Sequence, residues 1–155
     1  MKNLLLTFIL LFLSLNLIGQ SKESFTLKVN APPGATMIAP VDQTTDEQGN
    51  IYVLTKKWPD VYGVQTAVIF KYHPHKGVIW TIEIGNQEKS ISPQQLVWSK
   101  LGDLMMIGYY FGQAENNGIY FARVSSQGRV TTQKFIYLHE STDNLYPRKI
   151  KELAT

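Results

Sequence analysis

The most closely spaced pair of metal-ligating side chains is His73-Pro74-His75. In an extended segment, residues two apart project to the same side, as two ligands of one metal would. A zinc site needs three or four protein ligands, and the remaining histidine, His139, is distant in the chain. We therefore interpret His73 and His75 as weak metal candidates in an exposed turn. No metal and no cofactor is predicted.

Asp46, Gln48 and Asn50 resemble a fragment of a calcium-binding loop. An EF-hand loop places oxygen ligands at alternate positions, followed by a glycine and a distant glutamate. Here Gly49 comes too early and the glutamate is absent. Asp side chains also accept hydrogen bonds from backbone N–H groups two residues on, which stabilises turns. The segment is therefore predicted to be a side-chain-capped β-turn.

Aromatic side chains could supply a stacking surface for sugars. Trp80 lies in a regular apolar run and is expected to pack in the core, because aromatic residues dominate β cores. Trp58 precedes a proline in an expected loop, with Tyr62 close by. Trp58 and Tyr62 are the weak candidates for ligand binding. The other aromatic candidates are Trp98 and Tyr109-Tyr110-Phe111.

No sequence motif of catalysis is present. The chain has no Gly-x-Ser-x-Gly, no P-loop and no dinucleotide-binding fingerprint. No catalytic residue is predicted, and the expected function is not enzymatic.

Composition favours one β-rich domain. The 155 residues are 44% apolar and 17% charged, a globular balance, and 12% are aromatic, which favours strands. The net charge of +3 is too small and too evenly spread to indicate a nucleic-acid partner. The absence of cysteine excludes disulfides, thiolate metal sites and a lipoprotein anchor.

Residues 1–19 are predicted to be a signal peptide, an N-terminal signal helix that precedes the β-rich domain. Lys2 is followed by the apolar run Leu4–Ile18, which is shorter than the roughly 20 residues of a membrane-spanning helix. Cleavage is expected after Gly19, and a retained membrane anchor is the alternative. The predicted location is secreted, periplasmic or on the outer surface, with only transient membrane contact.

The rest of the chain is predicted to contain strands and turns, without a helix. Residues 20–36 form an N-terminal strand and linker, and prolines and glycines separate the later apolar runs. Expected strands are Met37–Val41, Ile51–Lys56, Ala67–Tyr72, Val78–Ile84, Gln95–Ser99, Leu104–Tyr110, Ile119–Val124 and Val130–Tyr137.

One turn recurs along the chain. Gly49-Asn50 is echoed by Gly102-Asp103 at an offset of 53 residues. Glycine permits the positive φ that a tight hairpin turn requires. Residues 144–150 resemble 90–96, displaced by 54. These matches predict two repeats, 37–86 and 87–138, and the start of a truncated third repeat over 139–155.

The motif Asp46-x-x-Gly49-Asn50-Ile51-Tyr52-Val53, followed by residues 67–72 and 77–80, resembles one unit of the bacterial seven-bladed β-propeller repeat family. The match covers 45–84 well. It covers 98–136 more weakly, with Asp103, Arg123 and Thr131 or Thr132 at the motif positions. The resemblance implies an all-β fold of antiparallel four-stranded blades, and an exported protein without an assigned enzymatic role.

The number of predicted blades raises a question of assembly. A closed propeller needs about four to eight blades, and two are predicted with the start of a third. Three explanations stay open: a fragment of a longer propeller, a subunit that closes a ring by self-association through exposed blade faces, or an independent two-sheet sandwich.

The predicted function is a scaffold or interaction module with a protein or glycan partner. The alternatives are a carbohydrate-binding or surface-binding module, and a subunit of an assembled propeller enzyme.

Overall fold

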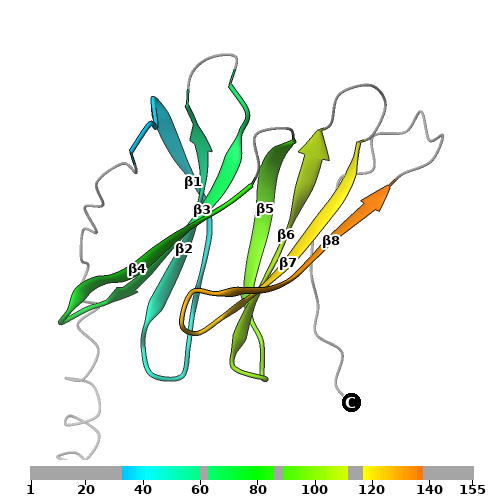
Figure 1. Ribbon diagram of the computed structural model, residues 1–155. Coiled ribbons are helices and arrows are strands. Elements are labelled where there is room, and N and C mark those ends of the chain that lie inside the picture. The colour runs from blue at the N-terminus through cyan, green and yellow to red at the C-terminus, as the bar shows by residue number, and fades with distance from the viewer. Residues whose placement is uncertain (1–32, 60–62, 86–88, 112–116, 138–155) are drawn as a thin grey trace, which may run out of the picture.

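The computed structural model describes residues 33–59, 63–85, 89–111 and 117–137, and contains eight strands in two four-stranded antiparallel sheets (Figure 1). The strand order follows the sequence in each sheet, so every neighbouring pair is a hairpin. The predicted all-β class is therefore confirmed. The predicted signal helix, the strand expected within 20–30 and residues 139–155 lie outside the described ranges. The strands are β1 (Met37–Thr45), β2 (Ile51–Trp58), β3 (Thr66–His73), β4 (Gly77–Ile84), β5 (Ser90–Trp98), β6 (Asp103–Phe111), β7 (Gly118–Ser125) and β8 (Val130–Tyr137).

The first strand of each sheet is longer than predicted and runs through a proline. Pro40 pairs with Thr55 and Pro93 with Gly108, and the register shifts by one residue directly after each proline. Proline has no N–H to give to a ladder, so an adjoining β-bulge lets the strand continue beyond it. The predicted strand Met37–Val41 was therefore too short, because the bulge lets β1 continue to Thr45.

Gly108 lets the backbone of β5 approach closely opposite the second proline. A Cβ at this position would lie 2.6 Å from the Ser92 carbonyl oxygen and 2.9 Å from Pro93 Cα. Real Cβ atoms do not approach backbone so closely, so a side chain here would separate the two strands.

A second bulge lies between the third and fourth strands of each sheet. The register shifts between Lys71 and Tyr72 in the first sheet, and between Arg123 and Val124 in the second. Ile79 and Thr131 are the extra residues opposite these shifts. Both sheets therefore carry two bulges at positions 52 or 53 residues apart in the sequence.

The predicted glycine turns are confirmed. In the turn from Asp46 to Asn50, the Gly49 N–H donates to the Asp46 carbonyl and Gly49 has a φ of 77°. The turn from Ser99 to Asp103 has the same pattern, with Gly102 at a φ of 80°. Only glycine adopts this left-handed conformation at low cost.

The core lies between the two sheets. Side chains alternate along each strand, so one face of β1–β4 supplies Tyr52 and Ile69, and the facing side of β5–β8 supplies Leu104 and Tyr120. All are buried in one continuous cluster. The buried cluster comprises Tyr52, Leu54, Ala67, Ile69, Ile84, Ile91, Leu96, Leu104, Met106, Tyr110, Tyr120, Ala122 and Val124.

Candidate functional site

The densest polar network in the described chain is centred on the Asp46 carboxylate. Oδ1 accepts the backbone N–H groups of Gln48 at 3.0 Å and Asn50 at 2.8 Å. Oδ2 accepts Asn50 Nδ2 at 2.7 Å and the Tyr52 hydroxyl at 2.9 Å. The predicted side-chain-capped turn is therefore confirmed, and its capping carboxylate is itself buried.

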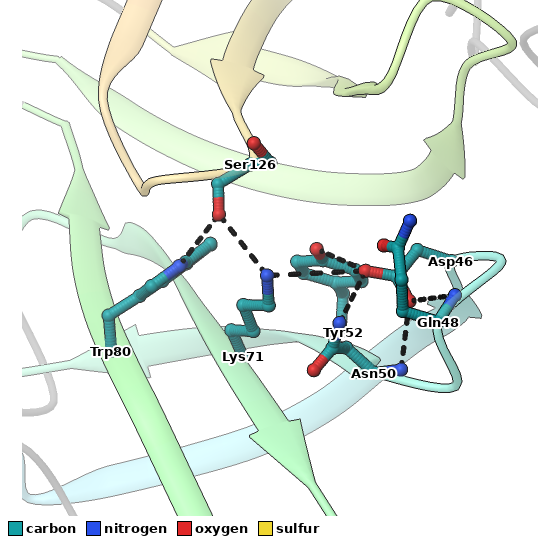
Figure 2. A network of polar contacts seen from close by, with 7 residues as sticks. All are labelled: Asp46, Gln48, Asn50, Tyr52, Lys71, Trp80 and Ser126. Carbon is teal, nitrogen blue, oxygen red and sulfur yellow. Dashed lines mark hydrogen bonds and ion pairs between the residues drawn. The ribbon is translucent and has the colours of Figure 1, made fainter.

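The same network crosses from one sheet to the other. Lys71 Nζ, from β3, lies 4.0 Å from Asp46 Oδ2 and donates to the Ser126 carbonyl at 3.3 Å. Trp80 Nε1, from β4, donates to that same carbonyl at 3.1 Å. Ser126 belongs to the β7–β8 turn of the other sheet, as Figure 2 shows. We call these seven residues, Asp46, Gln48, Asn50, Tyr52, Lys71, Trp80 and Ser126, the inter-sheet joint.

The electrostatics of the joint hold Asp46 ionised. Burial by itself raises the pKa of this carboxyl, but the hydrogen bonds from Asn50, Tyr52 and Gln48 outweigh burial and hold the pKa below its ordinary value. The pKa of Tyr52 is raised, first by burial and then by its hydrogen bond to the negative Asp46. Tyr52 therefore remains a neutral hydroxyl donor, as the network requires.

Aromatic rings close the joint on its apolar side. Tyr52 stacks on Trp98 of β5 with ring centroids 5.2 Å apart, and is tilted against Trp80 at 5.8 Å. Lys71 Nζ lies 5.3 Å from the Tyr52 centroid, within the range of a cation–π interaction. The prediction that Trp80 packs in the core is confirmed, since it packs against the cluster between the sheets.

The second sheet has a simpler counterpart of this arrangement. The Ser99 hydroxyl accepts the Leu101 N–H at 2.9 Å and takes the place of the capping carboxylate. Asp103, at the far end of this turn, lies 3.0 Å from Arg123 Nε of β7. Their contact is an ion pair without hydrogen-bond alignment. In both sheets a cation on the third strand faces an acid in the first hairpin turn.

The opposite face of the first sheet carries a separate ion pair. Lys57 Nζ lies 2.8 Å from Glu83 Oε2, and the Thr66 hydroxyl donates to Glu83 Oε1 at 2.6 Å. Burial alone raises the pKa of Glu83, but these two hydrogen bonds and the Lys57 charge outweigh it and lower the pKa. Glu83 is therefore ionised and its charge is neutralised by Lys57.

Of the two aromatic residues predicted to bind a ligand, the structure describes Trp58. Trp58 is the last residue of β2 and is half-buried, with Lys56 Nζ 5.3 Å from its ring centroid. Burial lowers the pKa of Lys56. Tyr62 lies outside the described residues, so ligand binding by Trp58 and Tyr62 stays a prediction.

His73 is the last residue of β3, and His75 lies in the turn that connects β3 to β4. Their ring centroids are 5.7 Å apart and tilted, and His73 Nδ1 accepts the His75 backbone N–H at 3.1 Å. Across residues 33–59, 63–85, 89–111 and 117–137, no group of three His, Cys, Asp or Glu side chains could hold a metal ion. His139, the remaining histidine, lies outside these ranges.

The charged groups near the two hairpin turns are paired with opposite charges. Asp46 faces Lys71, which also bonds to the second sheet, and Asp103 faces Arg123 within the second sheet. Among the described residues no helix is both long and apolar enough to cross a membrane.

The sequence predicts the capped turn of the joint, which contains Asp46 and Asn50. It does not predict that Lys71 and Ser126 are partners of this turn. Lys71 does appear in the repeat motif, opposite Arg123 at an offset of 52. That match is a signal that could have paired the cation with the turn acid. The Ser126 group is a backbone carbonyl, which every residue carries, so no side-chain signal exists for it.

Comparison with known proteins identifies no relative: no family model, no curated protein and no solved structure matches this chain.

Proposed function

We propose that this chain is an exported, non-enzymatic scaffold or interaction module, built from two units of a β-propeller-like repeat. One observation carries the proposal: both sheets have the same strand order and the same two bulges at corresponding positions. Bulges are specific features of a strand rather than random defects. Two sheets that share both bulges are best explained as copies of one unit.

The way the charged groups are used supports a scaffold role. The buried Asp46 is neutralised within the joint, and Glu83 is neutralised by Lys57. A general acid or base must instead be poised to exchange a proton with a substrate near the working pH. The hydrogen bonds on Asp46 and Glu83 lower both pKa values and move these carboxyls away from that range.

The experiment is a binding screen on the secreted protein, run beside a panel of hydrolase and lyase assays. We expect binding to a protein or glycan with no turnover of any substrate. On a glycan array, loss of signal in Trp58→Ala would assign the glycan alternative, and unchanged signal would argue against it. Catalysis by an assembled ring, detected as activity that co-elutes with an oligomer in light scattering, would overturn the non-enzymatic proposal.

A further inference from the structure

The face of β5–β8 that points away from the core is rich in apolar side chains. Leu104, Met106 and Tyr110 of β6 are buried against the first sheet, so the alternate residues of β6 point to the other side. Phe111 and Ile136 on that side are 45% and 51% exposed, whereas Tyr109 is 8% exposed and Met105, Ile107, Ile119 and Phe121 are half-buried. We call this surface the outer face; it comprises Met105, Ile107, Tyr109, Phe111, Ile119, Phe121 and Ile136.

The register relates the outer face to a surface that is already covered. Met105 pairs with Arg123 and Arg123 with Thr132, as Tyr52 pairs with Lys71 and Lys71 with Trp80. The outer face therefore corresponds to the face of β1–β4 on which β5–β8 packs. On that covered face Tyr52, Leu54, Ile69 and Ile84 are at most 2% exposed. Their counterparts are Met105, Ile107, Phe121 and Ile136.

The strand β5 is the first element of the second sheet to meet the first sheet, and hydrogen bonds hold it at both ends. The Gln65 N–H donates to Ser90 Oγ at 3.1 Å, and the Ile91 N–H donates to the Gln65 carbonyl at 2.8 Å. At the other end, the Leu96 N–H donates to Asp42 Oδ2 at 2.9 Å. Hydrogen bonds at both ends therefore fix the position of β5 on the first sheet.

The second sheet carries polar groups at the positions equivalent to Gln65 and Asp42, which bond to β5 in the first sheet. Asn117 directly precedes β7, as Gln65 directly precedes β3. Gln95 stands 53 residues after Asp42, and its amide oxygen can accept an N–H as the carboxylate does. Residues 144–150 resemble 90–96, and Asn144 carries a side-chain oxygen where Ser90 has its hydroxyl.

We propose that residues 144–150 of this chain dock on the outer face along β5, as β5 docks along β1. The proposal rests on the proposed repeat and names the surface and its occupant. Asn117 then exchanges hydrogen bonds with residues 144 and 145, as Gln65 does with Ser90 and Ile91.

The connecting chain favours this occupant over a second molecule. Five residues connect Ile84 to Ser90, and seven connect its counterpart Ile136 to Asn144. The second linker is therefore long enough for an equivalent crossing. A short tether also gives the segment an effective concentration on the order of millimolar, which a free second copy does not reach in ordinary solutions.

Introduced cysteines can test the contact, because the chain has none of its own. The test variant of the full chain is Asn117→Cys/Asn144→Cys, and the reference variant is Gln65→Cys/Ser90→Cys, placed where the structure shows the contact. The tether control is Asn117→Cys/Thr155→Cys. The readout is the rate of disulfide formation under mild oxidation, with intramolecular and intermolecular products separated by non-reducing electrophoresis.

We expect the test pair to form an intramolecular disulfide within about tenfold of the reference rate, and the control pair to react at least tenfold more slowly. If the test pair stays reduced while the reference pair forms its disulfide, docking is overturned. That result would not contradict the proposed repeat. Equal rates for test and control would also overturn docking, since the tether alone would explain them. Disulfide-linked dimers would replace the proposal with a second copy on the outer face. A reference pair that stays reduced would show that Gln65 and Ser90 do not make the contact from which the docking is inferred, and would overturn the proposal.

Discussion

At the scale of single residues, the molecule is distinguished by one buried carboxylate. Asp46 is 7% exposed, and a buried charge is costly unless it is paired and hydrogen-bonded. Four hydrogen bonds and the nearby Lys71 meet that requirement. The carboxylate thereby links the β1–β2 turn to the cation that contacts the second sheet.

Replacing Asp46 by asparagine should destabilise the protein by about 1–3 kcal/mol, because one buried donor loses its acceptor and Lys71 loses its counter-charge. The matched control is Glu47→Gln in the same turn, where the side chain is exposed. This control should change stability by less than about 0.5 kcal/mol. Chemical denaturation at pH 7 measures both. Equal stability of the two variants would show that the joint does not depend on the Asp46 charge.

The pH dependence of this difference follows from the lowered pKa of Asp46. A carboxyl whose folded pKa lies below its unfolded value contributes stability above the unfolded pKa, near 3.8, and loses it as the pH falls through the folded pKa. The stability gap between the wild type and Asp46→Asn should therefore be full at pH 6 and shrink below about pH 4. Urea titrations at pH 6, 4 and 3 test this, and a gap that widens on acidification would contradict it.

At the scale of elements, the hairpin turns are similar in backbone but differ in what surrounds them. Gly102 and Gly128 both have a φ of 80°. A Cβ on Gly102 would meet no atom within 4 Å, whereas on Gly128 it would lie 3.0 Å from the Trp80 ring. The β7–β8 turn is therefore held against the first sheet, while the β5–β6 turn has open space at its glycine.

Gly102→Ala and Gly128→Ala form a matched pair for this reason. Gly102→Ala should cost about 1–2 kcal/mol from the left-handed backbone alone. Gly128→Ala should cost about 1–3 kcal/mol more, because the new methyl group displaces Trp80. Thermal or urea unfolding gives the two values, and tryptophan fluorescence should shift in the native state of Gly128→Ala only. Identical losses in the two variants would argue against tight packing at the joint.

At the scale of the whole molecule, the two sheets share a single core. Leu54 and Ile69 of the first sheet and Leu104 and Met106 of the second belong to one buried cluster. These side chains are buried between the sheets, so each sheet depends on the other to cover them. The pair of sheets should therefore fold and unfold as one unit.

Cooperative unfolding is the expected consequence. Far-ultraviolet circular dichroism, which reports both sheets, should show a β-rich native spectrum. It should lose that signal at the same urea concentration as tryptophan fluorescence, which reports Trp58 together with Trp80 and Trp98, the two that pack against Tyr52. Two separated transitions would show that the sheets are independent, and a helical native spectrum would contradict the fold.

Local features were predictable because they depend on neighbours in the chain. Strand periodicity located parts of all eight strands, and the boundaries of Val130–Tyr137 match β8. The extent of β1 and β5 could not be predicted, since Pro40 and Pro93 alone indicate a break. Their bulges depend on pairing with Thr55 and Gly108, which lie 15 residues farther along the chain.

The sequence by itself determined the strand-and-turn order and the glycine positions, because alternation and positive φ are properties of adjacent residues. It also determined that Asp46 caps its own turn, since the acceptor and both backbone donors lie within five residues. Only the tertiary structure decided that Lys71 and Trp80 meet the Ser126 carbonyl, 55 and 46 residues away. That contact depends on how two sheets pack, and its acceptor is a backbone group without a side-chain signature. The same packing decided which face of each sheet is buried and left Phe111 and Ile136 exposed on the outer face of β5–β8.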